Sequence, residues 1–452
     1  MSNDISTSSI REFAEEVLTL AIKKGADEAE VYIKSSKKLS IEVKDQKIDA
    51  LESSFSFGYS LRVIKEKSLG FSYSTDRSNI HSVVDNAVEA ARWADKDEYL
   101  ELPAACHSRS VDIFDPEISA IEEDEATKKV CILENASYEV DKRIKKIRKA
   151  LGIFSSADVV IINSKGINTQ YSSTTCIAQI MAVAENGTES QMGWDFEGSR
   201  FLNQVSFEEV GRNAARFAVQ LLGSRRIHTV KTHIILDKAV AADFMEIFAS
   251  FLSSENVQKG KSLLSGKMGK KVMSPKINII DNGLLSGKLG SKPVDDEGVA
   301  SEEKILIKEG ILQGYLYNTY TAKKDRVSST GNAIRNRFSG LPYVGISNLY
   351  MEAVSKSNVL TFNELFKAAD KGLYITGAMG IHTVNPVSGE FSIGVSGLWI
   401  ENGKIEFPVK EAVISGNLLS LFEKIEAVGD DFRFYGNIGV PSLLFGPIEI
   451  SA

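Results

Sequence analysis

The chain has 452 residues, whereas a single domain usually spans about 100 to 200, so we expect two principal domains. A hydrophobic content of 43% and a charged content of 25% are typical of globular proteins and exclude a disordered chain. Acidic side chains outnumber basic ones by 60 to 53, so the overall charge gives no reason to expect a nucleic-acid partner.

The sequence also predicts the compartment. It contains no run of about 18 apolar residues, and residues 1–6 lack the basic flank and apolar core of a secretory signal. We therefore expect a cytoplasmic protein that has no membrane partner. The three cysteines, Cys106, Cys131 and Cys176, are odd in number and far apart, which favours reduced and buried structural thiols.

The N-terminal half, residues 1–223, alternates helical and strand patterns. Ser9 and Glu12 have capping-box spacing before an apolar face that ends at Gly25, which predicts a first helix. Further along, apolar residues at every second position predict strands, and apolar residues three or four apart predict helices. In chain order we expect strands near 39–43 and 55–63, helices over 79–93 and 123–150, strands over 158–163 and 169–184, and a helix over 206–223.

The expected second domain is residues 224–452, and a further boundary inside the first half is expected near residues 100–120. A strand over 232–237 and a helix over 239–251 open the second domain, and short strands between glycine-containing turns follow. We expect the α+β class, with an N-terminal α/β half of small sheets and long helices and a β-rich C-terminal domain.

The histidines do not form a zinc site of their own. A catalytic zinc needs about three protein ligands, commonly including two histidines one helical turn apart. No two histidines here are three or four residues apart, and no Gly-x-Ser-x-Gly or phosphate-loop motif occurs. The histidines, expected on the surface or in hydrogen bonds, are His81, His107, His228, His233 and His382.

An acidic triplet, Asp295-Asp296-Glu297, precedes Gly298. Adjacent carboxylates in an exposed turn are usually solvated, which is the expectation here. The alternative is a site for a hard cation, which prefers oxygen ligands.

Two segments are rich in basic residues. Residues 259–276 contain six lysines and no acid and are interrupted by glycines, which predicts a flexible basic loop. This loop is either solvated or able to contact a peptide carboxylate or a phosphate backbone. The lysines expected to contact substrate or partner are Lys259, Lys261, Lys267, Lys270 and Lys271. The run over 142–149 is expected to end the long helix, where cations meet the negative pole of the helix dipole.

Several segments match a known family when they are taken together and in order. They include 262–272, Asp295-Asp296-Glu297-Gly298, Ser329-Thr330-Gly331-Asn332-Ala333, 371–376, Asn385-Pro386-Val387-Ser388-Gly389-Glu390-Phe391-Ser392, Pro408-Val409-Lys410-Glu411 and Ser415-Gly416-Asn417-Leu418, with weaker matches over 25–30 and 58–63. With these segments the chain resembles the TldD/PmbA family, and specifically its TldE (PmbA) branch. The resemblance covers nearly the whole chain and is strongest in the C-terminal half.

In the family that this chain resembles, the TldD branch is a zinc protease with a His-Glu-x-x-x-His helix and a cysteine near the C-terminus. The matching helix places Met245, Glu246 and Ser250 at the positions of that motif, so both histidines are replaced. The stretch from Asp430 to Gly439, where the cysteine would fall, contains none. This chain is therefore identified with the branch that lacks the ligands and is expected to bind no metal and to be inactive alone.

The resemblance implies that this chain functions as one subunit of a heterodimer. The chain would be the non-catalytic subunit beside a TldD-like zinc protease, with zinc in that partner and an unfolded peptide as substrate. In isolation it would be able to form a homodimer. Two alternatives remain open: a self-sufficient metallopeptidase with a metal at Asp295, Asp296 and Glu297, and a regulator that binds a nucleoprotein such as DNA gyrase through the lysine loop.

Overall fold

The N-terminal half is built on one large antiparallel sheet. The structure, a computed structural model, describes residues 7–187 and 189–451. Six strands lie in the order β3-β2-β1-β4-β5-β6, so the small sheets expected from the sequence are joined into one. Their bounds are β1 Glu28–Lys44, β2 Lys47–Lys65, β3 Ser68–Ser74, β4 Ile144–Asn163, β5 Asn168–Glu185 and β6 Ser190–Ser199.

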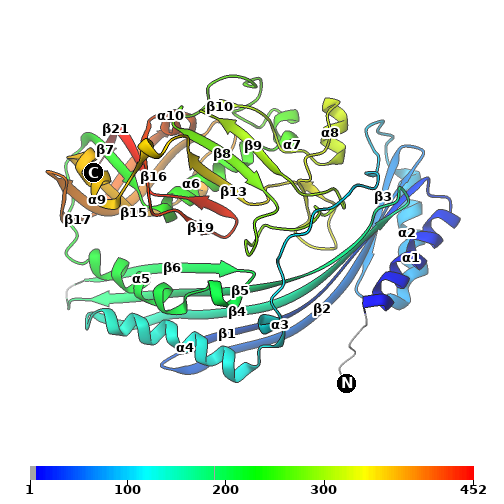
Figure 1. Ribbon diagram of the computed structural model, residues 1–452, viewed down its shortest axis with the longest axis horizontal. Helices are drawn as coiled ribbons and strands as arrows, with labels where there is room; N and C mark the ends of the chain where they lie inside the picture. The colour runs from blue at the N-terminus through cyan, green and yellow to red at the C-terminus, as the bar shows by residue number, and fades with distance from the viewer. Residues whose placement is uncertain (1–6, 188, 452) are drawn as a thin grey trace.

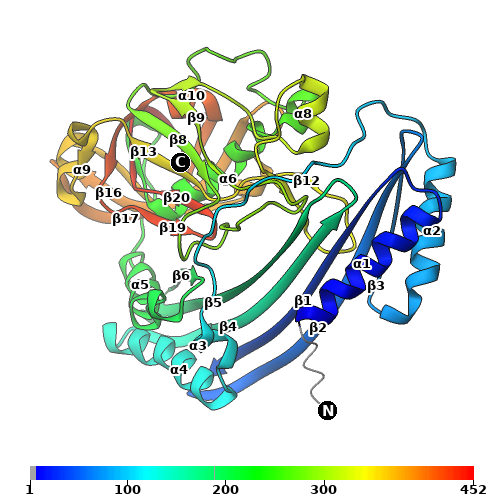
Figure 2. The same ribbon diagram turned by 45° about the vertical axis from the view of Figure 1, so that its right-hand side comes forward.

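Two pairs of helices cover the outer face of this curved sheet, one pair towards each end (Figures 1 and 2). α1 (Thr7–Lys23) and α2 (Ile80–Trp93) pack on residues such as Val31 and Leu61, whereas α4 (Glu123–Val140) and α5 (Phe207–Gln220) pack on residues such as Phe154. Successive side chains of a strand point to opposite faces, so the remaining residues line the inner face. Short helices α3 (Pro116–Ala120), η1 (Arg77–Asn79) and η2 (Leu202–Gln204) complete this half.

Two helix boundaries differ from the sequence prediction. α1 already begins at Thr7, so Ser9 lies inside the helix and is not its N-cap. The helix expected over 123–150 ends at Val140, and the basic run over 142–149 forms a turn and then the start of strand β4, which begins at Ile144. Register shifts after Ile144 and after Ile147 are β-bulges that bring Ile144, Ile147 and Ala150 to one buried face. This spacing of three residues imitates a helix in the sequence.

The C-terminal half contains two further sheets. Strand β21 pairs with β17 and β18 along one edge and with β7 along the other, which closes β7, β15, β16, β17 and β21 into a ring. The second sheet has the order β10-β9-β8-β13-β20-β19. The α+β class with a β-rich C-terminal half is confirmed.

The elements of this half follow one another closely in the chain. They are β7 (Val230–Leu236), α6 (Lys238–Phe251), α7 (Ser254–Gln258), β8 (Ile277–Asn282), β9 (Glu303–Lys308), β10 (Ile311–Leu312), α8 (Thr319–Asp325), β11 (Ala333–Ile334), β12 (Tyr343–Val344), β13 (Leu349–Ala353), η3 (Lys356–Asn358), β14 (Val359–Leu360), α9 (Phe362–Ala369), β15 (Gly372–Met379), η4 (Ile381–Thr383), β16 (Glu390–Glu401), β17 (Lys404–Asn417), α10 (Leu418–Glu423), β18 (Ile425–Gly429), β19 (Arg433–Tyr435), β20 (Ile438–Val440) and β21 (Leu443–Ser451).

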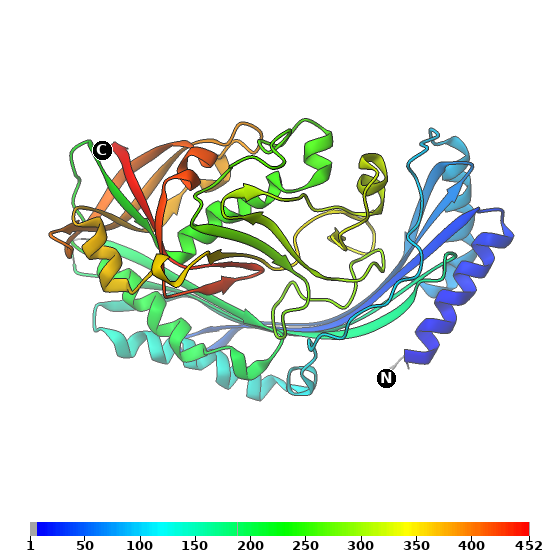
Figure 3. The same ribbon diagram turned by 45° about the horizontal axis from the view of Figure 1, so that its top comes forward.

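Helix α6 lies in the largest core cluster, between the two C-terminal sheets, and contacts β7 and β15 on one side and β19 and β20 on the other (Figure 3). The whole C-terminal half lies over the inner face of the N-terminal sheet, opposite the helix pairs (Figure 1). In residues 7–187 and 189–451, no helix is long and apolar enough to cross a bilayer.

Candidate functional site

The first candidate is helix α6, because the expected remnant of a metal motif lies on it. Its N-cap Asp237 accepts a hydrogen bond from the backbone N–H of Ala239 over 2.9 Å. Met245 is fully buried in the core cluster, Glu246 is exposed, and the Ser250 hydroxyl donates to the carbonyl of Ile247 over 2.7 Å. The three motif positions therefore do not converge on one point in space.

The residues on α6 do not fit a zinc ion. A thioether held inside a core and a hydroxyl already engaged with the backbone are not the nitrogen, sulfur and carboxylate ligands that zinc takes. Within the described part of the chain, no cluster of three or more His, Cys, Asp or Glu side chains is placed to hold a metal. Asp243 lies near Glu246. The Asp243 residue is exposed by surface area, yet the surrounding protein desolvates its carboxyl, and this together with the Glu246 charge raises the pKa of Asp243 to about 6.

The histidines are dispersed over the molecule. His81, His107 and His228 are exposed, and Nε2 of the partly exposed His233 lies 3.7 Å from Oε2 of Glu426. The side chain of His382 lies outside the part that the structure describes.

The acidic triplet is not an exposed turn, contrary to the expectation from sequence: Asp295, Asp296 and Glu297 are 4%, 2% and 1% exposed. Asp295 accepts hydrogen bonds from three backbone N–H groups, and Asp296 accepts one from Lys292 Nζ over 2.8 Å. With their oxygens occupied by protein donors, these carboxylates are structural, which argues against the self-sufficient metallopeptidase. The triplet is buried because the C-terminal half packs this turn against the N-terminal sheet.

A buried charge network joins the two halves of the protein through this turn. Arg62 donates to Glu30 over 2.7 Å and to Glu297 over 2.8 Å, and Arg335 donates to the second oxygen of Glu30 over 2.5 Å. Burial alone would raise the pKa of Glu297, but the Arg62 charge and the backbone N–H of Thr319 hold that pKa below its usual range. Burial and the neighbouring Glu297 charge raise the pKa of Asp295 to about 7.

A second anchor between the halves lies at the edge strand β6. Arg433 of β19 donates to both carboxylate oxygens of Asp195 over 3.0 Å and to the carbonyl of Phe196 over 2.8 Å. Although Arg433 favours the charged form, burial raises the pKa of Asp195 above its ordinary value.

The segment over 259–276 has no regular helix or strand, but it is anchored to the C-terminal half. Leu264, Val272 and Met273 are buried, and the backbone N–H groups of residues 269 and 272 donate to the carbonyls of residues 312 and 310. Lys259 pairs with Glu255 on α7 over 2.5 Å. The other lysines proposed as contacts lie on the surface, with Lys261, Lys270 and Lys271 exposed and Lys267 partly so.

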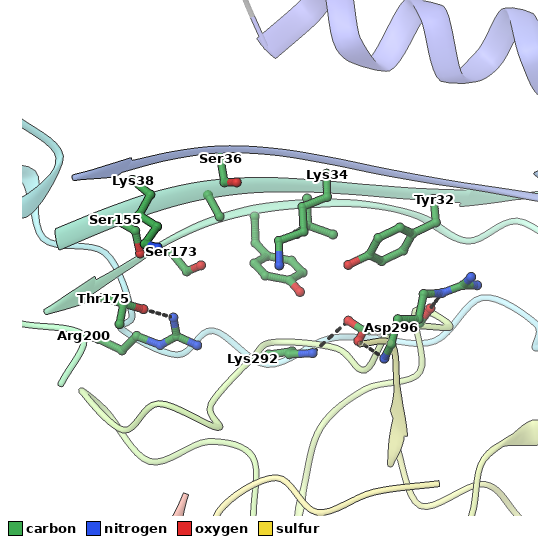
Figure 4. A pocket seen from close by; sticks show the side chains of 14 residues that line it. Tyr32, Lys34, Ser36, Lys38, Ser155, Ser173, Thr175, Arg200, Lys292 and Asp296 are labelled. Atoms are coloured by element: carbon green, nitrogen blue, oxygen red, sulfur yellow. Dashed lines mark hydrogen bonds and ion pairs between the residues drawn. The ribbon is translucent and has the colours of Figure 1, made fainter. Parts of the chain in front are cut away.

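Two cavities lie between the halves. One, of about 510 Å³, is lined by Arg62 and Glu297 of the charge network and by Lys259, so one of the five proposed lysines faces it. The other, of about 260 Å³, lies on the inner face of the N-terminal sheet and is lined mainly by polar and basic side chains (Figure 4).

Comparison with known proteins identifies the family. Three models of PmbA/TldA metallopeptidase domains match in succession: domain 1 over residues 29–91, the central domain over 116–222 and the C-terminal domain over 229–452. A metalloprotease PmbA homolog from Buchnera aphidicola is 32% identical over 441 residues, which cover 96% of this chain and 95% of that protein. The chain belongs to the TldD/PmbA family, in its PmbA/TldE branch.

Solved structures of similar proteins show the same fold. A Thermotoga maritima protein described as a putative modulator of a DNA gyrase superposes with a TM-score of 0.90 at 27% identity, over 98% of this chain and 100% of that one. TldE from Thermococcus kodakarensis gives a TM-score of 0.88 over 97% and 100% of the two chains. At 22% identity this second likeness shows the fold alone.

In this TldD/PmbA-family chain, the sequence analysis missed the residues that join the halves and line the smaller cavity. Glu30 lies between Ala29 and Val31, and Arg62 lies between Leu61 and Val63, so no local charge pattern marks either residue. Only alternation along β1 and β2 could have placed these two on one face. The cysteines also differ from expectation: Cys176 is buried, Cys131 is partly buried and Cys106 is exposed.

Proposed function

We propose that this chain is the non-catalytic subunit of a TldD/TldE-type metalloprotease that processes or degrades unfolded peptides in the cytoplasm. Zinc would be held by a TldD-like partner subunit. The observation that carries this proposal is the state of α6 in a metallopeptidase-family chain. There Met245 packs in the core and Ser250 bonds to its own helix, so the residues present do not fit the metal.

The chain's own residues would then serve to build the chamber and to hold the substrate. Three exposed lysines, Lys261, Lys270 and Lys271, lie on a segment whose backbone is already anchored. Binding of a substrate to these lysines would therefore cost little further backbone entropy. An unfolded peptide that carries carboxylates would be attracted to such a surface.

The direct test uses the purified chain alone, a purified TldD-like subunit alone, and their mixture, with an unfolded peptide as substrate. Metal content and cleavage are measured for each sample. We expect no zinc and no cleavage for this chain alone, and more cleavage in the mixture than with the partner alone. Stoichiometric zinc and chelator-sensitive cleavage by this chain alone would overturn the proposal in favour of a self-sufficient peptidase.

A second test separates the lysine segment from the rest of the surface. In the mixture, the triple variant Lys261→Ala, Lys270→Ala, Lys271→Ala is expected to raise KM for an acidic peptide, because attraction of the substrate is lost. The charge-matched control is Lys142→Ala, Lys145→Ala, Arg148→Ala, which removes three exposed cations from β4 and the turn before it. Equal effects of the two triple variants would mean that only net charge matters.

A further inference from the structure

The smaller cavity is built by both halves of the protein. Its roof is the inner face of the N-terminal sheet, where Tyr32, Lys34 and Ser36 of β1 lie beside side chains of β4 and β5 (Figure 4). Its floor is the loop that contains Lys292 and Asp296. Of the motifs considered above, the acidic triplet contributes one residue to this site, Asp296, and α6 contributes none.

Positive charge dominates the lining of this cavity. Its basic residues are Lys34, Lys38, Arg200, Lys292 and Arg335, whereas Asp296 is the one carboxylate among the lining residues. That carboxylate is already bound, through Oδ1 to Lys292 over 2.8 Å and through Oδ2 to the backbone N–H of Arg335 over 2.7 Å. Arg335 is engaged with Glu30, and Lys38 lies 3.6 Å from Glu52. The charges of Lys34 and Arg200 are left without a carboxylate among the described contacts.

Arg200 is fixed in place by neutral groups. Its Nη1 donates to the carbonyl of Thr174 and to the hydroxyl of Thr175, both over 3.0 Å, and its Nη2 donates to the carbonyl of Leu289 over 2.5 Å. Its Nε is buried and has no hydrogen-bond partner in the described residues. A buried donor without an acceptor is costly, and the neutral groups around Arg200 leave its positive charge without an anion from the protein.

Lys34 reaches into the same space from β1 (Figure 4). One side of this side chain is open to solvent, yet the walls of the cavity desolvate the ammonium group. Burial lowers the pKa of Lys34, and the positive charges of Lys292 and Arg200 lower it further against the opposing effect of Asp296. An anion bound between these three cations would remove their mutual repulsion.

Neutral hydroxyl groups complete the lining. Burial and the Asp296 charge raise the pKa values of Tyr32 and Tyr171 well above normal, so both phenols stay protonated and can donate hydrogen bonds. Hydroxyls of Ser155, Ser173 and Thr175 also face the cavity. The volume of about 260 Å³ is below the roughly 300 to 1,000 Å³ of sites for drug-sized ligands, so it suits a small group.

We propose that this cavity is a binding site for a small oxyanion, either the carboxylate of a peptide or an inorganic phosphate, held by Lys34, Arg200 and Lys292. Lys292 has spare capacity, because an ammonium group carries three donors and Asp296 takes one. The inference goes beyond the proposed subunit role, since binding needs only this chain and no partner.

Isothermal titration calorimetry of the purified full chain at low ionic strength tests the proposal. The probes are sodium phosphate, N-acetyl-diglycine with a free carboxylate, and the C-terminal amide of that peptide. We expect saturable binding of phosphate or of the free carboxylate, but not of the amide. Binding of phosphate alone identifies an inorganic anion as the ligand, and binding of the carboxylate alone identifies a peptide end.

Lys34→Met is expected to weaken this binding about tenfold or more, as for the loss of one hydrogen bond to a charged group. The matched control is Lys37→Met, which removes an exposed lysine from the opposite face of the same strand. Lys34→Gln gives a second variant, and circular dichroism verifies that each variant is folded. Equal weakening in the Lys34 and Lys37 variants, or no saturable binding of either anion, would overturn the proposal.

Discussion

Nη1 of Arg62, in the N-terminal sheet, donates a hydrogen bond over 2.8 Å to Oε1 of Glu297, in the C-terminal half. The two side chains are 10% and 1% exposed, although 235 residues separate them in the chain. A charge pair that is both buried and distant in sequence links the stability of one half to that of the other.

Arg62→Ala should therefore destabilise the whole protein. Removing one partner leaves the Glu297 charge buried without its cation, which costs about 3 to 5 kcal/mol in comparable pairs. Lys96→Ala is the control, because the pair between Lys96 and Glu66 has side chains 68% and 71% exposed and such pairs contribute about 0 to 1 kcal/mol. Urea denaturation followed by circular dichroism measures both variants, and similar midpoints would contradict the prediction.

The pKa of Asp243, raised to about 6, predicts a specific pH dependence of stability. The unfolded carboxyl ionises near pH 3.9, whereas the folded one keeps its proton until about pH 6. The contribution of this group to stability is therefore fully present below about pH 4 and is lost as the pH rises to about 6.

Asp243→Asn should abolish that loss, so the melting temperature of the variant relative to the wild type should increase between about pH 4 and 6 and then stay constant. Glu246→Gln is the companion variant. Because the Glu246 charge contributes to the raised pKa, its removal should shift this transition to lower pH. A difference between variant and wild type that does not change with pH would show that Asp243 titrates normally.

Gly193 of β6 lies directly against helix α5. A Cβ at this position would lie 2.0 Å from the carbonyl oxygen of Ala214 and 2.4 Å from the nitrogen of Ala218, both of which are backbone atoms. Gly193→Ala should therefore lower the free energy of unfolding by about 1 to 3 kcal/mol through overpacking. Gly314→Ala is the control, because no atom lies within 4 Å of its added Cβ. Thermal melts of the two variants should differ clearly, and a Gly193 variant as stable as its control would contradict the prediction.

The three thiols should react in a fixed order with a thiol reagent such as DTNB. Cys106 is exposed and should react first. Burial and the Glu134 charge raise the pKa of the partly buried Cys131, so it should react more slowly. Burial raises the pKa of Cys176 to about 12, so this thiol should react only in denaturant. Rapid labelling of all three in the native protein would be incompatible with this structure.

Local patterns predicted much of the fold. The apolar spacing of α6 and of α5 depends on neighbours within a few positions, and both helices form close to where the sequence predicts them. The exception, the region over 140–150, shows the limit of such patterns. Two bulges in β4 change the spacing between buried residues from two, as in a regular strand, to three. Bulges arise from the pairing with the facing strand β5, which local sequence does not reveal.

The site could be predicted only in part, because the sequence around a residue does not show that a distant segment of the chain buries it. Asp295 and Glu297 were expected in solvent because nothing nearby in the sequence reveals Arg62. Lys34 and Ser36 lie in a run of five polar residues, 34–38, which is typical of a strand exposed to solvent. The C-terminal loop that turns this face into a cavity is over 250 residues away. The replacement of both histidines on α6 was recognisable, since it concerns residue identity alone.

Strand β4 pairs with β1 from Glu30↔Asn163 to Val43↔Ala150, so the segment matched by the central-domain model completes the sheet of the segment matched by the domain 1 model. Deleting either segment would remove the strand that pairs with the other along this whole length. The remaining edge strand would expose unpaired backbone N–H and C=O groups, which favours aggregation. The two segments are therefore expected to fold as one unit. Viable exchanges between relatives of this protein should have their crossover points near residues 223–229, and seldom inside residues 29–222.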